Sequence, residues 1–316
     1  MKKFLSLILT TLLLLSCTAC AEETAFKASA PSGAPALALA TLAAEKPEDY
    51  TFVAAETISA EFVNQNADFI IAPVIAGAKL YKMGKSTYKL AAVVSWGNLF
   101  IASQKADFTL NDLNGAKVVL FGENTINAAV VNYALQQNGI VPASIEYLAS
   151  AANTQSLLLT DAEAIVVTAE PALTAAKMKN AAITAYAVND LYKTATGFDG
   201  YTQAALFVKA ETAEKSPEAV AAYLKAVEES CAKATTDIEA VANAAVAIEV
   251  LPNVKVAMNA IPGCAVRYVG ALEAKEQIEF TANIDLTQFG GAACGRFLLC
   301  CGVNSRIHCP SAWGAC

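Results

Sequence analysis

Residues 117–139, KVVLFGENTINAAVVNYALQQNG, hold the pattern that decides the fold. Residues 117–121 are mostly apolar and predict a buried strand, and a polar turn then leads into a helical run that ends at residue 137. Asn138 and Gly139 supply a helix stop, because both residue types tolerate the left-handed backbone that ends many helices. A strand followed by a helix indicates part of a βαβ unit, in which crossover helices join parallel strands.

The same alternation extends in both directions from this segment. Strands are predicted at residues 26–29, 50–55, 68–72, 90–95, 99–103, 145–148, 164–167, 183–188 and 201–209. Helices are predicted at residues 36–44, 56–64, 74–83, 110–113, 152–159, 171–179, 219–232 and 238–250. Because the pattern restarts near residue 104 and returns near residue 201, we expect one domain formed by residues 24–102 and 203–291. A second domain, residues 104–200, would interrupt it.

Charge and arginine content narrow the range of ligands. The chain has 316 residues with 22 basic and 29 acidic side chains, a net charge of -7, so no basic surface is expected and no nucleic-acid partner. Its arginines are Arg267, Arg296 and Arg306. No arginine before residue 267 could bind a carboxylate ligand through two hydrogen bonds, so a ligand bound in this way is not expected.

The N-terminus has the features of an export signal. Lys2 and Lys3 precede an apolar run at residues 4–15, which is too short to span a bilayer, so residues 1–19 are predicted to be a cleaved signal peptide. The following residues resemble the lipobox of bacterial lipoproteins, with lipidation expected at Cys20 (or Cys17). Cys20 has the favoured small residues before it, whereas Cys17 has the usual leucine three residues upstream. The alternative is an ordinary secretory signal.

The C-terminal end differs in composition from the rest of the chain. Five of the nine cysteines and His308, the sole histidine, lie in residues 294–316. The cysteine spacings match no paired zinc motif, so we assign no metal site and no cofactor. Residues 292–316 are expected to be disordered or out of frame.

Several phrases along the chain together resemble one family. They are DFIIAP at 68–73, LNDLNGAKV at 110–118, YALQQNGI at 133–140, PEAVAAYLK at 217–225 and AIPGC at 260–264. Over about residues 24–291 the chain resembles the solute-binding lipoproteins of ABC importers, nearest the branch for nitrate, sulfonate, taurine and thiamine-pyrimidine precursors. The resemblance implies an α/β, two-lobed type II periplasmic-binding fold, in which each lobe is a mainly parallel sheet flanked by helices and two hinge crossings join the lobes.

This family resemblance also implies a function. A lipid-anchored monomer on the outer face of the cytoplasmic membrane would trap a small solute between its lobes. It would then deliver the solute to an ABC permease and its ATPase, without catalysis. Two alternatives stay open, a lyase-type enzyme on the same fold and a ligand-sensing lipoprotein. General acid-base catalysis most often uses histidine, and the chain before residue 308 has none.

The predicted ligand contacts lie after the strands, where helix N-termini present N–H groups to the gap. They are Ser32, Gly33, Glu56, Thr57, Pro73, Trp96, Asn98, Gly122, Asn124, Thr125, Glu170 and Tyr201. The carboxylates favour an amine-bearing ring stacked on Trp96 or Tyr201, and an anion held by N–H groups is the alternative. Each polar residue could instead cap a helix or form a turn, and Trp96 could be buried in the first domain.

Overall fold

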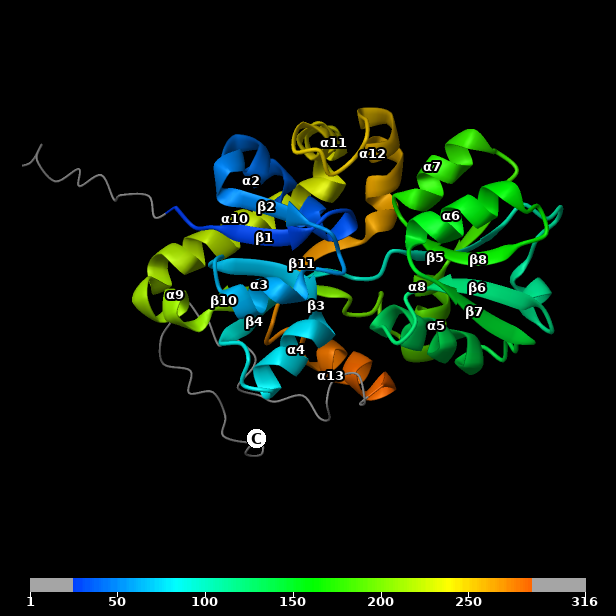
Figure 1. The fold of residues 1–316 in the computed structure, drawn as a ribbon, viewed down its shortest axis with the longest axis horizontal. Helices are drawn as coiled ribbons and strands as arrows, with labels where there is room; N and C mark the ends of the chain where they lie inside the picture. Colours follow the sequence, from blue (N-terminus) through cyan, green and yellow to red (C-terminus); the bar gives the residue numbers. More distant parts are fainter. Residues whose placement is uncertain (1–24, 286–316) are drawn as a thin grey trace, which may run out of the picture.

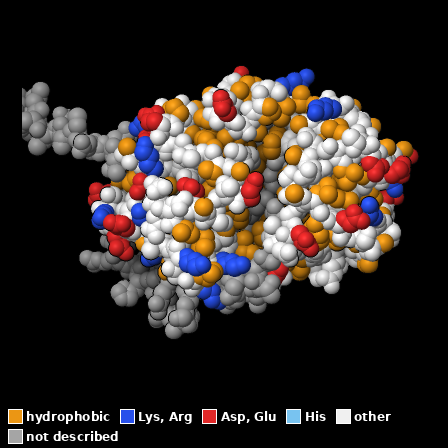
Figure 2. Space-filling view, in the orientation of Figure 1, with side chains coloured by type: hydrophobic (Ala, Val, Ile, Leu, Met, Phe, Trp, Pro, Cys, Tyr) orange, Lys and Arg blue, Asp and Glu red, His pale blue; other side chains and the backbone are white. Residues whose placement is uncertain are grey.

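The computed structural model describes residues 25–285, which form two lobes that lie side by side (Figure 1). The predicted signal peptide with Cys17 and Cys20, and the tail at residues 292–316, lie outside the described residues. Within residues 25–285, no helix combines the length and the apolar character needed to cross a membrane. On the face shown in Figure 2, the surface is hollowed between the two lobes.

The first lobe contains a sheet of six strands among the described residues, in the order β11-β4-β10-β3-β1-β2. The strands are β1 (Ala28–Pro31), β2 (Tyr50–Val53), β3 (Phe69–Pro73), β4 (Tyr88–Ser95), β10 (Ala204–Lys209) and β11 (Val266–Gly270). Strand β1 pairs in parallel with β2 and β3, whereas β10 is antiparallel to β3 and β4, and β11 is antiparallel to β4.

Short helices and one long helix cover both faces of this sheet. They are η1 (Ala34–Leu39), α2 (Ala40–Glu45), η2 (Pro47–Asp49), α3 (Ser59–Asn64), α4 (Val74–Lys82), α9 (Ala210–Lys215), α10 (Pro217–Thr236), α11 (Ile238–Ala247), α12 (Val254–Ala260) and η4 (Ile261–Cys264). Successive strand residues point to opposite faces. Thus Ile71 packs in the cluster formed with η1, α2, α10 and α11, while its neighbour Ile70 packs with α3 and α4.

The second lobe contains a sheet of five strands among the described residues, in the order β7-β6-β8-β5-β9. Its strands are β5 (Leu99–Ser103), β6 (Lys117–Phe121), β7 (Ser144–Leu148), β8 (Ile165–Ala169) and β9 (Thr184–Ala187). Its helices are η3 (Leu110–Leu113), α5 (Ile126–Gln137), α6 (Ala151–Thr160), α7 (Ala172–Lys179) and α8 (Val188–Thr196). Strand β6 is parallel to β7 and β8, and β5 is antiparallel to β8 and β9.

The α/β two-lobed fold is confirmed, but both sheets are mixed rather than mainly parallel. The parallel strands β3 and β8 end at the junction between the lobes. A strand that starts at the junction must therefore run the opposite way, as the pairing of Ala204 with Pro73 and of Leu99 with Ala169 shows. Strand β5 also belongs to the second sheet, whereas we expected residues up to 102 in the first domain. The first crossing accordingly lies at residues 96–98 and not at the predicted domain boundary between residues 102 and 104.

The last described helix, α13 (Lys275–Ile284), takes the chain back to the second lobe. It follows β11 of the first sheet, yet it packs beside α5 (Figure 1). The Phe280 ring lies 5.4 Å from the ring of Phe198 and 6.0 Å from that of Tyr133, measured between ring centroids. In addition to the two predicted crossings, the chain therefore passes between the lobes once more, within residues we expected to lie wholly in the first domain.

Candidate functional site

Two of the segments that cross between the lobes lie side by side. The first, residues 96–98, joins β4 to β5, and the second, residues 197–203, joins α8 to β10. Gly97 and Gly200 have φ values of 89° and 95°, which residues with a side chain rarely adopt. A Cβ atom on Gly200 would collide with the backbone of Trp96, and one on Gly97 would collide with the ring of Tyr201. Glycine at both positions therefore allows the crossings to touch.

A hydrogen-bonded network of neutral side chains occupies the junction, with Gln203 at its centre. The Gln203 Nε2 donates to Asn98 Oδ1 at 2.9 Å and to Asn127 Oδ1 at 3.2 Å. The Gln203 Oε1 accepts from Ser95 Oγ at 2.9 Å, and the Tyr201 hydroxyl donates to Asn127 Oδ1 at 2.8 Å. These groups come from β4, both crossings and α5, so the network joins the two lobes.

Glu170, at the end of β8, is tied to the first crossing and to its own helix. Its backbone N–H donates to Asn98 O at 3.0 Å, and the Asn98 side-chain amide donates to Glu170 O at 2.9 Å. The carboxylate accepts from the backbone N–H of Thr174 at 3.0 Å and from the Thr174 hydroxyl at 2.9 Å, which caps the first turn of α7. Burial raises the pKa of Glu170, although both Thr174 hydrogen bonds oppose that shift.

The aromatic rings that we expected to stack on a solute are buried in this structure. Trp96 is 1% exposed and Tyr201 is fully buried. One face of the Trp96 ring is covered by the Arg267 guanidinium, whose central carbon lies 4.3 Å from the ring centroid. The Trp96 indole N–H donates to Arg267 O at 2.9 Å. The alternative prediction, burial of Trp96, is the arrangement that the structure shows.

The other predicted contacts of the first lobe follow β1, β2 and β3. Ser32, Glu56 and Thr57 are exposed, and Gly33 precedes η1 with a φ of 105°. The Thr57 hydroxyl donates to Ala54 O at 2.8 Å and so serves a turn. Pro73 precedes α4 and lies beside the second crossing. The backbone N–H of the next residue, Val74, donates to Gln203 O at 3.2 Å.

The predicted contacts of the second lobe form the turn between β6 and α5. Gly122 and Asn124 have φ values of 71° and 58°. The Thr125 hydroxyl donates to Gly122 O at 2.6 Å and accepts from the backbone N–H of Ala128 at 3.5 Å, so it caps α5. Of all the predicted residues, only Asn98, Glu170 and Tyr201 join the network around Gln203 through hydrogen bonds among the described residues.

Gln203 and Asn127 were not among the residues predicted to contact a ligand. Gln203 is a polar residue just before the apolar run 204–208, and Asn127 lies in the first turn of a helix that follows a predicted edge. Both positions carried a usable signal, a polar side chain next to a predicted crossing or strand end. Their mutual contact needs the fold, because 76 residues separate them.

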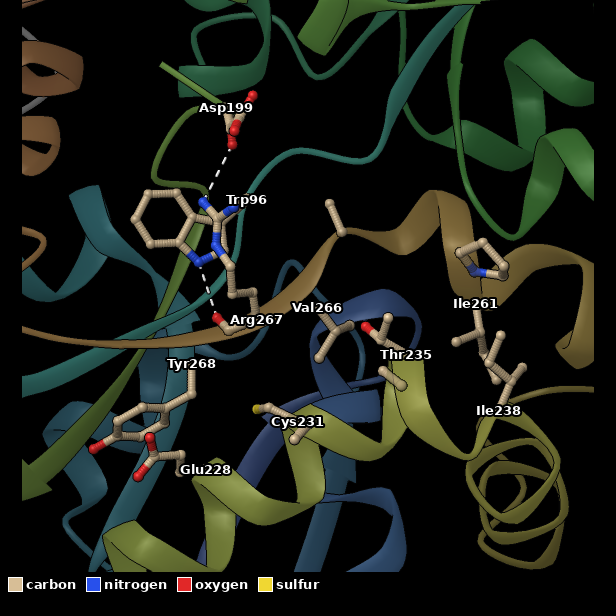
Figure 3. A pocket seen from close by; sticks show the side chains of 14 residues that line it. Trp96, Asp199, Glu228, Cys231, Thr235, Ile238, Ile261, Val266, Arg267 and Tyr268 are labelled. Carbon is tan, nitrogen blue, oxygen red and sulfur yellow. Dashed lines mark hydrogen bonds between the residues drawn. The ribbon is translucent and has the colours of Figure 1, made fainter.

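A cavity of about 490 Å³ lies next to the crossings, between α10 and β11 (Figure 3). Its lining includes Trp96, Asp199, Cys231, Thr235, Arg267 and Tyr268. Burial raises the pKa of the Cys231 thiol to about 12, so this thiol stays protonated at neutral pH. Of the twelve predicted ligand contacts, only Trp96 lines this cavity.

Comparisons with known proteins agree with this architecture. Residues 89–240 match the model of a family described as NMT1/THI5 like. No curated protein matches the sequence in a direct comparison.

Three solved structures resemble the chain along most of its length. An ABC transporter protein from Parabacteroides distasonis is 22% identical, with a TM-score of 0.74, covering 87% of this chain and 99% of the other. The periplasmic aliphatic sulphonate-binding protein SsuA from Escherichia coli is 16% identical, with a TM-score of 0.67, covering 87% and 91%. The alkanesulfonate-binding protein SsuA from Xanthomonas axonopodis pv. citri, bound to MOPS, is 15% identical, with a TM-score of 0.59, covering 85% and 94%.

These likenesses confirm the resemblance that the sequence phrases indicated. Residues 89–240 match the NMT1/THI5-like family model, and the chain has the two-lobed fold seen in solved periplasmic binding proteins.

Proposed function

We propose that the protein is an extracytoplasmic solute-binding lipoprotein of an ABC importer, which captures a small solute between its lobes. The observation that carries this proposal is the network around Gln203, where polar side chains from both lobes and both crossings meet. A solute that contacts these side chains would interact with both lobes at once, and the distance between the lobes can change. The family match and the fold of the solved relatives support the same conclusion.

Binding would act through the equilibrium between open and closed lobes. A solute shifts this equilibrium only by its difference in affinity for the two states, and it contacts both lobes only in the closed one. Moving from mostly open to mostly closed takes about 5 kcal/mol. A few hydrogen bonds to amides and hydroxyls can supply this free energy when they form in a site from which water is excluded.

The chemistry of the junction favours a neutral or weakly charged polar solute. Its side chains are amides and hydroxyls, and the buried carboxylate of Glu170 is already bonded to Thr174. The burial of both Trp96 and Tyr201 argues against an amine-bearing ring stacked on either of them. The exposed edges at Ser32, Thr57, Asn124 and Thr125 would complete the site through hydroxyl, amide and backbone N–H groups.

Delivery would use a permease and its ATPase, with the protein held at the membrane by a lipid on Cys20 (or Cys17). A monomer suffices for this role, because both halves of the proposed site come from one chain. The solved relative named as an ABC transporter motivates these proposals.

A thermal-shift experiment on the full chain tests the proposal. Methanesulfonate, MOPS, nitrate, cytosine and putrescine would be added separately over a range of concentrations. A solute that binds the folded state at one hundred times its Kd adds about 2.7 kcal/mol and should raise the Tm by roughly 5–10 °C. Recovery of the solute unchanged after incubation would distinguish binding from the enzyme alternative.

Asn127 offers a matched control for the location of the site. Among the described residues its Nδ2 has no hydrogen-bond acceptor, while its Oδ1 accepts from Tyr201 and Gln203. Asn127→Asp keeps both accepted bonds but removes the donor, so it should abolish the Tm increase. Gln136→Glu makes the same charge change on the exposed side of α5 and should preserve the increase. A full Tm increase in Asn127→Asp would place the site elsewhere.

A further inference from the structure

The two lobes meet where η4 of the first lobe lies against Glu170 of the second. A Cβ atom built on Gly263 would lie 2.9 Å from Cγ of Glu170, 3.2 Å from Cζ of Phe100 and 3.3 Å from Oε1 of Glu170. Cβ atoms in proteins essentially never approach another heavy atom as closely as the first of these distances. Gly263 has no positive φ, so a turn conformation does not explain the glycine. The contact between the lobes is what excludes a side chain here.

Neither neighbour in the second lobe can move aside easily. Glu170 is held at its backbone by two hydrogen bonds with Asn98 and at its carboxylate by two hydrogen bonds from Thr174. It is only 7% exposed. Phe100 lies on β5, which is paired on both sides with β8 and β9. A methyl group at position 263 would therefore press against two fixed side chains.

The first-lobe side of the contact is equally constrained. Ile261 and Cys264, the first and last residues of η4, are 1% and 0% exposed. Ala265 follows with a φ of 49°, and its carbonyl accepts from the Trp96 backbone N–H at 3.1 Å. Since η4 cannot shift within its own lobe without breaking this packing, strain at Gly263 would be relieved by separating the lobes.

We propose that Gly263 sets how closely the two lobes approach, and is thus a positioning residue for the closed state that holds a solute. The role of Gly263 in solute capture rests on the proposed function. Its close contact with Glu170 and Phe100 does not depend on any solute. Any larger residue at position 263 would hold the lobes apart where α12 of the first lobe contacts α7 of the second.

Hydrogen exchange measured by mass spectrometry on the full chain tests the contact without any solute. In Gly263→Ala, peptides that cover residues 168–176 and 256–264 should exchange at least about fivefold faster than in the wild type, because overpacking a closed interface favours its opening. The control is Gly270→Ala at the end of β11, where a Cβ atom meets nothing within 4 Å and φ is not positive. Its exchange should match the wild type.

A second substitution keeps the test decisive if Gly263→Ala alters the fold. Glu170→Ala removes the Cγ that the new methyl group would meet, so most of the Gly263→Ala effect should disappear in that background. Unchanged exchange in Gly263→Ala, or an equal effect with and without Glu170, would overturn the proposal. If no solute in the thermal-shift panel binds, the exchange result still stands. If one binds, Gly263→Ala should reduce its Tm increase.

Discussion

Arg267 connects the two chain crossings through one guanidinium group. It stacks on Trp96 of the first crossing, and its Nη2 donates to Asp199 O of the second at 3.2 Å (Figure 3). It is the only arginine among residues 25–285. Because a planar cation can stack and donate at the same time, arginine suits this position better than lysine.

Replacing Arg267 by methionine should loosen both crossings while keeping most of the apolar stem. The stacked cation and one hydrogen bond together suggest a loss of about 1 kcal/mol in the free energy of unfolding. Urea titration measures this loss, and a red shift of Trp96 emission in a Trp313→Phe background reports water at the ring. Lys193→Met, which removes only the exposed ion pair with Asp199, is the control. Equal effects of the two variants would contradict this role for Arg267.

Glu170 should give stability a recognisable pH dependence. Burial raises its pKa in the folded state, so the folded chain holds this proton to a higher pH than the unfolded chain does. The stability that Glu170 contributes is then fully present below the unfolded pKa, about 4.3, and is lost as the pH rises through the folded pKa. The wild type should therefore lose stability relative to Glu170→Gln as the pH rises above about 4.

Asp112 supplies a comparison of opposite sign. Hydrogen bonds from the backbone and side chain of Thr109 hold the pKa of Asp112 below its usual range. Its contribution is present above the unfolded pKa and is lost as the pH falls, so the wild type should gain stability relative to Asp112→Asn as the pH rises. Urea unfolding at several pH values measures both differences. If both stability differences changed with pH in the same direction, the pKa shift assigned to Glu170 or the one assigned to Asp112 would be wrong.

At the scale of elements, local sequence signals predicted some segments closely and left others unseen. The short helix 110–113 has the predicted bounds, and α4 begins at Val74 as expected after Pro73. Strand β11 and helix α13 were not predicted. Strand β11 is short and carries the exposed Arg267, and the residues of α13 form no apolar run. Their places depend on contacts between residues far apart in the chain, such as Phe280 with Phe198, which no local pattern contains.

Helix α13 should stabilise the junction through Phe280. This half-buried ring contacts Tyr133 and Tyr192 of the second lobe and Phe198 of the second crossing. Phe280→Ala should cost about 2 kcal/mol, less than a fully buried phenylalanine, and should broaden the unfolding transition as the lobes uncouple. Glu276→Ala, an exposed change on the same helix, should cost less than about 0.5 kcal/mol. A sharp transition with unchanged midpoint in Phe280→Ala would show that α13 does not couple the lobes.

At the scale of the molecule, the lobes share part of their hydrophobic core. One apolar cluster includes Ile70 of the first sheet, Ile101 of the second, both Trp96 and Tyr201 at the crossings, and Ile278 of α13. The sequence predicted two α/β units and their order from periodicity. It did not predict this shared core, nor the contact of Gln203 with Asn127, since both depend on how the units are placed against each other.

The return of α13 also limits how the second lobe could be used as a module. A fragment of residues 99–197 alone would contain its whole sheet, yet Tyr133 and Tyr192 would lose the helix that covers them. An exposed aromatic surface of this kind promotes self-association. Circular permutants and biosensor fusions built on this lobe should therefore carry residues 275–284 along with it.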